Sequence, residues 1–115
     1  MTRSRATAKK AGAKWDKDVV DYLIANGWPH AERRAKRGKN DAGDVSGVLG
    51  VCLELKNVNR FDLAGWVTQA REEAANAGAR HWAAWAKRDG YTSPAEGYVV
   101  MNGEQYVRLL KEAGY

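Results

Sequence analysis

Residues that constrain a chain covalently or conformationally are scarce in this sequence. It has one cysteine, Cys52, and two prolines among 115 residues. A single thiol excludes an internal disulfide and any zinc site built from several cysteines. Neither His30 nor His81 has a spacing that suggests a nucleophile's partner, so we interpret Cys52 as a packing residue and expect the histidines to be structural or exposed.

Long apolar runs are also missing. No stretch of about 18 apolar residues is present, and the first residues lack the apolar core of a signal peptide. We therefore expect no membrane partner and a cytoplasmic location in a bacterial or phage-infected cell. No repeat or linker divides the chain, and its length fits one domain, which we expect at residues 14–115.

Positive charge is concentrated in two places. Residues 1–14 carry five basic side chains and no acid, which matches the net charge of +5. We expect residues 1–13 to be a flexible basic arm that contacts DNA through Lys9 and Lys10. A second basic cluster spans residues 33–39, and the side chains that we expect to bind phosphate there are Arg33, Arg34, Arg37 and Lys39.

The stretch from 43 to 57, GDVSGVLGVCLELKN, follows this basic cluster. Its residues 51–56 alternate between apolar and polar side chains, the pattern of a strand with one buried face. Glu54 and Lys56 therefore point the same way. A three-residue loop ending in Gly50 predicts a hairpin, because this loop favours a left-handed third residue.

In the predicted hairpin register, Gly47 pairs with Val51 and Asp44 lies directly opposite Glu54. Opposed carboxylates, with Cβ atoms roughly 5 Å apart, repel unless a charge between them compensates. A divalent cation bound by oxygen ligands is the natural candidate. The alternative is a solvated hairpin with a charged outer face, since a GD pair followed by ExK is a short and permissive pattern.

The remaining chain predicts an α/β domain with helices packed on a mixed sheet, in the order α-β-β-β-α-β-β-α. A helix is expected at residues 14–26, and the helix that follows the hairpin begins at an Asn59 cap and ends at Gly78. Trp66, Trp82 and Trp85 are expected in the core. The other expected elements are strands at 28–36, 80–86 and 98–101 and a closing helix at 104–113.

This order, with D and ExK on the strands, resembles the PD-(D/E)XK nuclease superfamily, and within it most the small Holliday junction resolvases of archaea and phages. The likeness covers residues 12–86 and implies a restriction-endonuclease-like core. It implies an active site of Asp44, Glu54, Lys56 and an acid on the first helix. Counting back from the Gly-Trp pair at 27–28 gives Asp16 for that acid, where the family usually has Glu; Asp18 and Glu32 remain alternatives.

The resemblance also implies a cofactor and a further polar residue. Asp44, Glu54, Asp16 and the carbonyl of Leu55 would hold Mg²⁺, or Mn²⁺ in its place, and Lys56 would orient a water or stabilise negative charge. Members of the superfamily often carry a glutamine on the following helix, here Gln69, although an exposed helix residue is an equal alternative.

The expected function is a Mg²⁺-dependent endonuclease that resolves four-way DNA junctions as a homodimer. Two symmetric nicks require two active sites related by a two-fold axis, and one chain supplies one. A nuclease of the same fold that cuts linear or flapped DNA is the nearest alternative. A non-catalytic DNA-binding module is the alternative from a different class.

Overall fold

The computed structural model describes residues 4–35 and 38–115. The predicted order of helices and strands is observed, with two short 3-10 helices added. The elements are α1 (Arg5–Ala25), β1 (Glu32–Arg33), η1 (Gly38–Asn40), β2 (Val45–Ser46), β3 (Val51–Lys56), α2 (Leu63–Ala77), β4 (His81–Ala86), η2 (Pro94–Glu96), β5 (Tyr98–Val100) and α3 (Gly103–Glu112). The expected DNA contact Arg37 lies outside the described residues.

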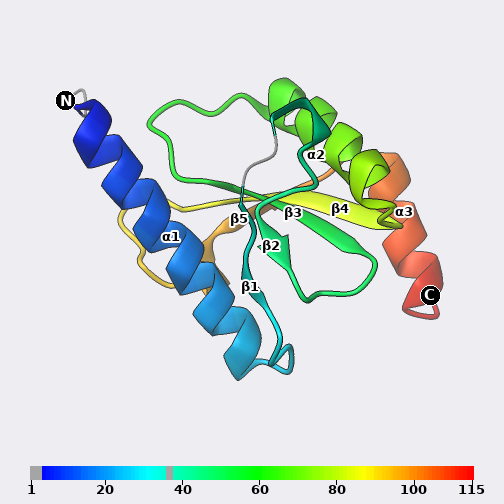
Figure 1. Ribbon diagram of the computed structural model, residues 1–115. Helices are drawn as coiled ribbons and strands as arrows, with labels where there is room; N and C mark the ends of the chain where they lie inside the picture. Colours follow the sequence, from blue (N-terminus) through cyan, green and yellow to red (C-terminus); the bar gives the residue numbers. More distant parts are fainter. Residues whose placement is uncertain (1–3, 36–37) are drawn as a thin grey trace.

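The fold is mixed α/β, with a three-stranded mixed sheet at its centre (Figure 1). β4 is the middle strand, parallel to β3 and antiparallel to β5. β1 and β2 form a separate two-stranded antiparallel sheet. In the described parts of the chain, no helix is long and apolar enough to cross a membrane.

α1 and α2 cover opposite faces of β3. Leu53 and Leu55 pack in one cluster with Trp15 and Val19 of α1. Cys52 points to the other face and packs with α2 and Trp82. Alternation along β3 therefore sends the leucines toward α1 and the polar side chains toward α2.

Small residues let α2 approach the sheet closely. In the parallel register, Glu54 pairs with Ala84 and Lys56 with Ala86. Both alanines are buried and pack against Trp66 of α2. The core positions predicted for Trp66 and Trp82 are confirmed, whereas Trp85 is only half-buried.

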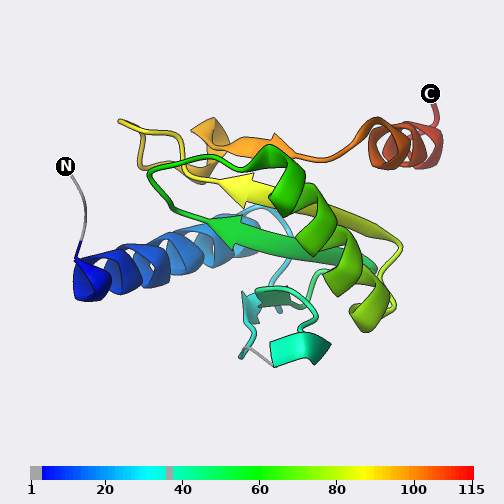
Figure 2. The ribbon, with the colours of Figure 1, turned by 90° about the horizontal axis from the view of Figure 1, so that it is seen from above.

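The prediction that the first helix starts at residue 14 is wrong. α1 begins at Arg5 and is capped by Ser4, whose Oγ accepts a hydrogen bond from the Thr7 amide at 3.1 Å. Residues 5–13 are therefore helical and not a separate flexible arm, because their alanines and lysines favour helix over coil. Figure 2 shows this N-terminal part of α1 reaching past the sheet.

The extent of the first strand and the start of α2 differ from the predictions by more than one residue. The first strand covers only Glu32–Arg33 of the expected 28–36. α2 begins later than expected, since the capping residue is Asp62, which accepts from the Gly65 amide at 2.9 Å, and not Asn59. Its predicted end at Gly78 is confirmed by the left-handed backbone of that glycine.

The predicted hairpin register is also wrong. β2 pairs with β1 and not with β3, so Asp44 and Glu54 are not ladder partners. The turn itself is as expected, since Gly50 has a φ of 76° and the Val51 amide donates to the Val48 carbonyl at 3.2 Å. β3 instead uses its inner edge to pair with β4, which lies in the centre of the sheet.

Candidate active site

The polar face of β3 carries Glu54 and Lys56 beneath α2. Glu54 is 2% exposed, and its Oε1 lies 3.5 Å from the Lys56 ammonium. Both side chains come from one strand with the expected alternation, so the backbone alone sets their spacing. The ExK pattern thus places the acid and the lysine of one strand in contact beneath α2, and not on a solvated strand face.

Gln69 joins these two side chains from α2. Its carbonyl oxygen accepts a hydrogen bond from Lys56 Nζ at 2.7 Å, and its Nε2 donates to Glu54 Oε1 at 3.2 Å. The amide therefore accepts a hydrogen bond from the Lys56 ammonium at its oxygen and donates one to the Glu54 carboxyl group at its nitrogen. The placement of Gln69 at the site agrees with the prediction, and the exposed alternative is excluded.

Asp44 reaches the same strand from the chain before β2. Its amide donates to the Leu53 carbonyl at 2.8 Å, and its Oδ2 accepts from the Leu55 amide at 2.7 Å. The Asp44 side chain is buried, and its hydrogen bond to Glu54 opposes the rise in the pKa of that residue. Asp44 and Glu54 are therefore brought together through β3 backbone contacts, although not by the predicted ladder.

A glycine makes this approach possible. Gly43 has a φ of 96°, a backbone conformation that L side chains rarely adopt. A Cβ atom there would lie 2.8 Å from Cys52 Sγ and 3.0 Å from the Leu53 carbonyl oxygen. Any larger residue at position 43 would push Asp44 away from β3.

Glu73 is a site residue that the sequence prediction missed. It lies one turn after Gln69 on α2 and is 4% exposed. Its hydrogen bond and its charge raise the pKa of Glu54. One oxygen of each glutamate, Oε2, is buried without a hydrogen-bond partner. The spacing of four residues from Gln69 was the available signal, because it puts both side chains on one face of a helix.

Burial and this second glutamate change the protonation of Glu54. Desolvation, followed by the hydrogen bond and charge of Glu73, raises the pKa of Glu54 to about 8, against the opposing effects of Lys56 and Asp44. Two ionised carboxylates offer only acceptors to each other, whereas a single proton supplies a donor. Without a cation, Glu54 is therefore mainly protonated at neutral pH.

Cys52 is placed on the same strand but has different chemistry. Burial is the main cause that raises the pKa of its thiol to about 12, and its Sγ donates to the Ala42 carbonyl at 3.5 Å. The thiolate needed for nucleophilic attack is thus strongly disfavoured. This agrees with the packing role predicted for Cys52.

The donor atoms fit a hard divalent cation. Within residues 4–35 and 38–115, no three His, Cys, Asp or Glu side chains form a group that could hold a metal by themselves. Mg²⁺, however, is commonly bound by one or two carboxylates, with water and substrate phosphate completing its ligands. Asp44 and the buried, partner-free Oε2 of Glu54 are suitable donors of this kind.

The three candidates for a third acid lie elsewhere. Asp16 pairs with Arg33 at 3.3 Å and belongs to α1, on the face of β3 opposite to Glu54 and Lys56. Asp18 pairs with Lys14 at 2.8 Å, and Glu32 is exposed on β1. A role for Asp16 in metal binding stays a prediction.

The expected DNA contacts have different surroundings. Lys9, Lys10 and Lys39 are exposed, whereas Arg33 is exposed but shares its charge with Asp16. Arg34 is half-buried, and its Nε is enclosed without a hydrogen-bond partner. Phosphate binding by these side chains stays a prediction.

A hollow of about 190 Å³ lies beside the site. It is lined by Gln69 and Glu73 of α2, by Lys39 of η1 and by Asp41, which follows η1. Asn76 of α2 holds this segment in place by donating to the Asp41 carbonyl at 2.8 Å. The hollow thus connects the buried carboxylates with one of the expected phosphate contacts.

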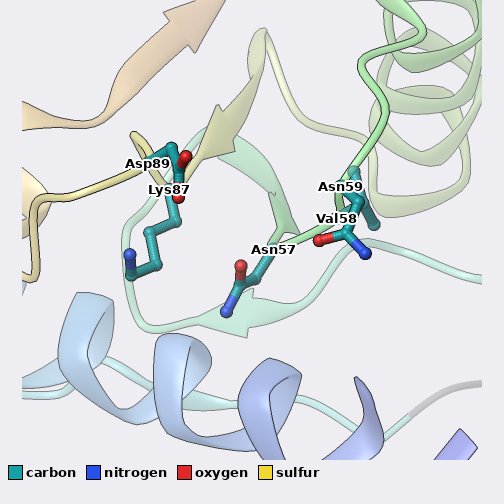
Figure 3. Close-up of a pocket in the computed structure, with 5 residues that line it drawn as sticks. All are labelled: Asn57, Val58, Asn59, Lys87 and Asp89. Carbon is teal, nitrogen blue, oxygen red and sulfur yellow. The ribbon is translucent and has the colours of Figure 1, made fainter. Parts of the chain in front are cut away.

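A second polar hollow, of about 110 Å³, lies where β3 and β4 end. Figure 3 shows the side chains of Asn57 and Lys87 pointing into the space between these strand ends and α1. Asn57 follows Lys56 directly, and its amide donates to the Ala11 carbonyl at 3.2 Å. This contact fixes the end of β3 against α1.

The chemistry of the site is the basis for assigning a function. Comparisons of the chain with protein-family models, with curated proteins and with solved structures find no match. The informative features are therefore the paired carboxylates, the adjacent lysine and the bridging glutamine.

Proposed function

We propose that this protein is a metal-dependent endonuclease with a PD-(D/E)XK core that cuts branched DNA, as a Holliday junction resolvase does. The observation that carries the proposal is the set of contacts around β3. Glu54 and Lys56 come from one strand, Gln69 bridges them, and Asp44 is bonded to the same strand. Carboxylates beside a lysine are the groups that metal-assisted phosphodiester hydrolysis requires.

The carboxylates have the role of binding the cation. Asp44 and Glu54, with the carbonyl of Leu55, would hold Mg²⁺ or Mn²⁺, and Asp16 remains a candidate further ligand. When bound, the ion supplies Lewis-acid polarisation of a phosphate and makes a water more acidic. The buried acidic cluster repels phosphate on its own, so a bound cation is needed before the substrate can approach.

Lys56 and Gln69 have complementary roles. The ammonium of Lys56 can donate to a phosphate oxygen or to the attacking water, where negative charge develops in the transition state. Gln69 holds this ammonium beside Glu54 and limits its rotamers. Gln69 is thus a positioning residue.

Basic side chains around the site support DNA as the substrate. Lys39 is exposed and lines the same hollow as Gln69. Arg33, Arg34 and Arg37 precede it in the chain, and Lys9 and Lys10 are exposed on α1, the helix that covers the other face of β3. Contacts of this kind bind the phosphate backbone without reading sequence.

A junction resolvase must nick two strands symmetrically, so we expect two copies of the chain to act together. Nicking of linear or flapped DNA by one copy is the second nuclease candidate. A DNA-binding module without catalysis is disfavoured by the buried carboxylates, because repulsion between acids and phosphate would weaken such a module.

The deciding experiment compares cleavage of labelled four-way junction, flap and linear duplex, with Mg²⁺ or with EDTA. We expect paired nicks in the junction that require Mg²⁺ and that are lost in Asp44→Asn and Glu54→Gln while DNA binding persists. Asp21→Asn, on the exposed side of α1, is the matched carboxyl-to-amide control and should cut normally. Absence of cleavage of every substrate would reject the nuclease, and equal cleavage of linear duplex would reject junction specificity.

A further inference from the structure

α3 meets the sheet with its polar side chains. Gln105 is 1% exposed and lies 2.8 Å from His81 Nδ1, while Glu112 Oε2 lies 2.5 Å from His81 Nε2. Arg108 Nη1 donates to the Arg80 carbonyl at 3.0 Å. Within α3, Gln105 is the one fully buried residue. The helix is therefore held at β4 by hydrogen bonds and an ion pair, and Leu109 adds an apolar side chain that lines one pocket with Trp82.

Apart from Leu109, which shares a pocket with Gln105, the apolar residues of α3 lie on another side of the helix. Tyr106, Val107 and Leu110 follow Gly103 at the spacing i, i+3, i+4, i+7, which forms one stripe along a helix. Tyr106 is 55% and Val107 48% exposed, and Leu110 is half-buried. Figure 2 shows α3 at the margin of the molecule, where no other described helix or strand covers its outer side. This stripe is what a helix normally buries.

The outer face of α3 has a shallow depression, and side chains of opposite charge lie at the two ends of the helix. A depression of about 420 Å³ is lined by Gly103, Glu104, Val107, Arg108 and Lys111. Glu104 stands at the N-terminal end of the helix and Lys111 at its C-terminal end. Within one copy Glu104 lies 3.9 Å from Arg108, and an antiparallel copy of the same helix would also place it beside a lysine.

We propose that the apolar stripe of α3 (Tyr106, Val107 and Leu110) packs against the same stripe of a second copy of this chain, antiparallel about a two-fold axis. Val107 lies near the axis, and Glu104 of each copy faces Lys111 of the other. A self-complementary surface of this kind closes on itself and produces a dimer, not a filament. Packing of apolar stripes between two helices is the usual basis of such contacts.

This inference is independent of catalysis. The stripe of α3 would join the two copies expected for the proposed resolvase, but it contains no residue of the candidate active site. The oligomeric state is therefore measured without DNA and without metal. A dimer that cuts no DNA would reject the nuclease and leave this inference intact, whereas a monomer that cuts DNA would do the reverse.

The test is sedimentation equilibrium of the full chain over a range of concentrations. We expect a dimer, and we expect Val107→Glu to raise the dissociation constant by at least about 100-fold, because two carboxylates would be buried without partners. Val58→Glu is the matched control: Val58 is 44% exposed, in the loop between β3 and α2. Figure 1 shows this loop on the opposite side of the molecule from α3. Melting curves verify that both variants fold.

Charge reversal tests the antiparallel arrangement separately. Glu104→Lys and Lys111→Glu should each weaken the dimer by about tenfold, because each creates like charges across the two-fold axis. The double variant should recover most of the loss, since it restores opposite charges with their positions exchanged. A monomeric wild type, or a dimer insensitive to Val107→Glu, would overturn the proposal. Single reversals that the double variant fails to rescue would overturn the antiparallel pairing.

Discussion

Gln69 donates a hydrogen bond from Nε2 to Oε1 of Glu54 over 3.2 Å, and this bond ties α2 to the polar face of β3. The same amide accepts from Lys56 at its oxygen, so a reversed amide would face donor with donor and acceptor with acceptor. The amide therefore has one favourable orientation, which fixes the distance between carboxylate and ammonium.

Replacing Gln69 with leucine should lower junction cleavage by about 10- to 100-fold with little change in DNA binding. The substitution keeps the volume but frees Lys56 and removes a hydrogen bond from buried Glu54. Single-turnover cleavage rates provide the measurement. Thr68→Leu, an exposed neighbour on α2, introduces the same side chain outside the site and should leave the rate unchanged. An unaltered rate in Gln69→Leu would contradict its positioning role.

Stability in EDTA should fall as pH rises from about 4.5 to about 8, because folded Glu54 keeps its proton over this range while unfolded Glu54 loses it. The pKa of Glu54 is raised, so its deprotonation favours the unfolded state by on the order of 5 kcal/mol over the whole range. Denaturant titrations at several pH values measure the free energy of unfolding of the wild type and of Glu54→Gln, and the difference between the two proteins at each pH tests the prediction.

Glu54→Gln has no proton to lose, so its stability should depend less on pH than that of the wild type in this range. Glu96→Gln, at an exposed surface position, is the matched control and should follow the wild type. Parallel profiles for wild type and Glu54→Gln would show that Glu54 has an ordinary pKa.

Gly43→Ala should destabilise the fold by roughly 1 to 3 kcal/mol and weaken Mn²⁺ binding. The added Cβ meets both a strained backbone and the Leu53 carbonyl, and relief of that contact moves Asp44. Gly90→Ala separates backbone strain from the steric contact of the added Cβ. Gly90 has a φ of 81°, but nothing lies within 4 Å of a Cβ built there. The control should lose stability without losing Mn²⁺ affinity, as measured by calorimetric titration.

Glu112→Gln should lower the melting temperature at neutral pH and have less effect in acid. The hydrogen bond with His81, aided by Arg80, lowers the pKa of Glu112 below its ordinary value of 4.5. A carboxyl with a lowered pKa stabilises the folded state above its ordinary value, and this contribution disappears as pH falls through the folded value. Equal effects at both pH values would indicate a packing role only.

Replacing Lys9 and Lys10 with glutamine should weaken DNA binding and reduce the slope of log K against log salt by up to about 2. Substitution is preferable to deletion, because residues 5–13 belong to α1. Lys14→Gln with Lys17→Gln removes the same charge from the same helix, but these lysines are already paired with Asp18 and Asp21. That control should change the slope less.

Local sequence patterns were sufficient to predict much of this fold. The alternation of residues 51–56 defined β3 and the shared face of Glu54 and Lys56, and Gly78 marked the end of α2. Gly50 identified the turn correctly, but a turn does not determine which strands pair. β3 is buried on both faces and pairs in parallel with β4, a contact set by the α2 crossover between them.

Other site features depend on contacts that no local pattern encodes. The pairing of Asp16 with Arg33 joins residues far apart in the chain. Glu73 shares a helix face with Gln69, but an exposed glutamate, Glu72, stands beside it, so its burial depends on how α2 is rotated on the sheet. The start of α1 was missed because basic, alanine-rich residues were interpreted as disordered, although the same residues favour helix.

The alanines at positions 84 and 86 have a consequence for how this protein can lose activity. They are the strand neighbours of Glu54 and Lys56, and α2 rests on them through Trp66. A valine at either position would lift the helix and separate Gln69 and Glu73 from Glu54 without altering a single polar atom. In a complete mutational scan of cleavage activity, Ala84 and Ala86 should therefore be among the most sensitive positions, although their methyl groups do not contact the substrate.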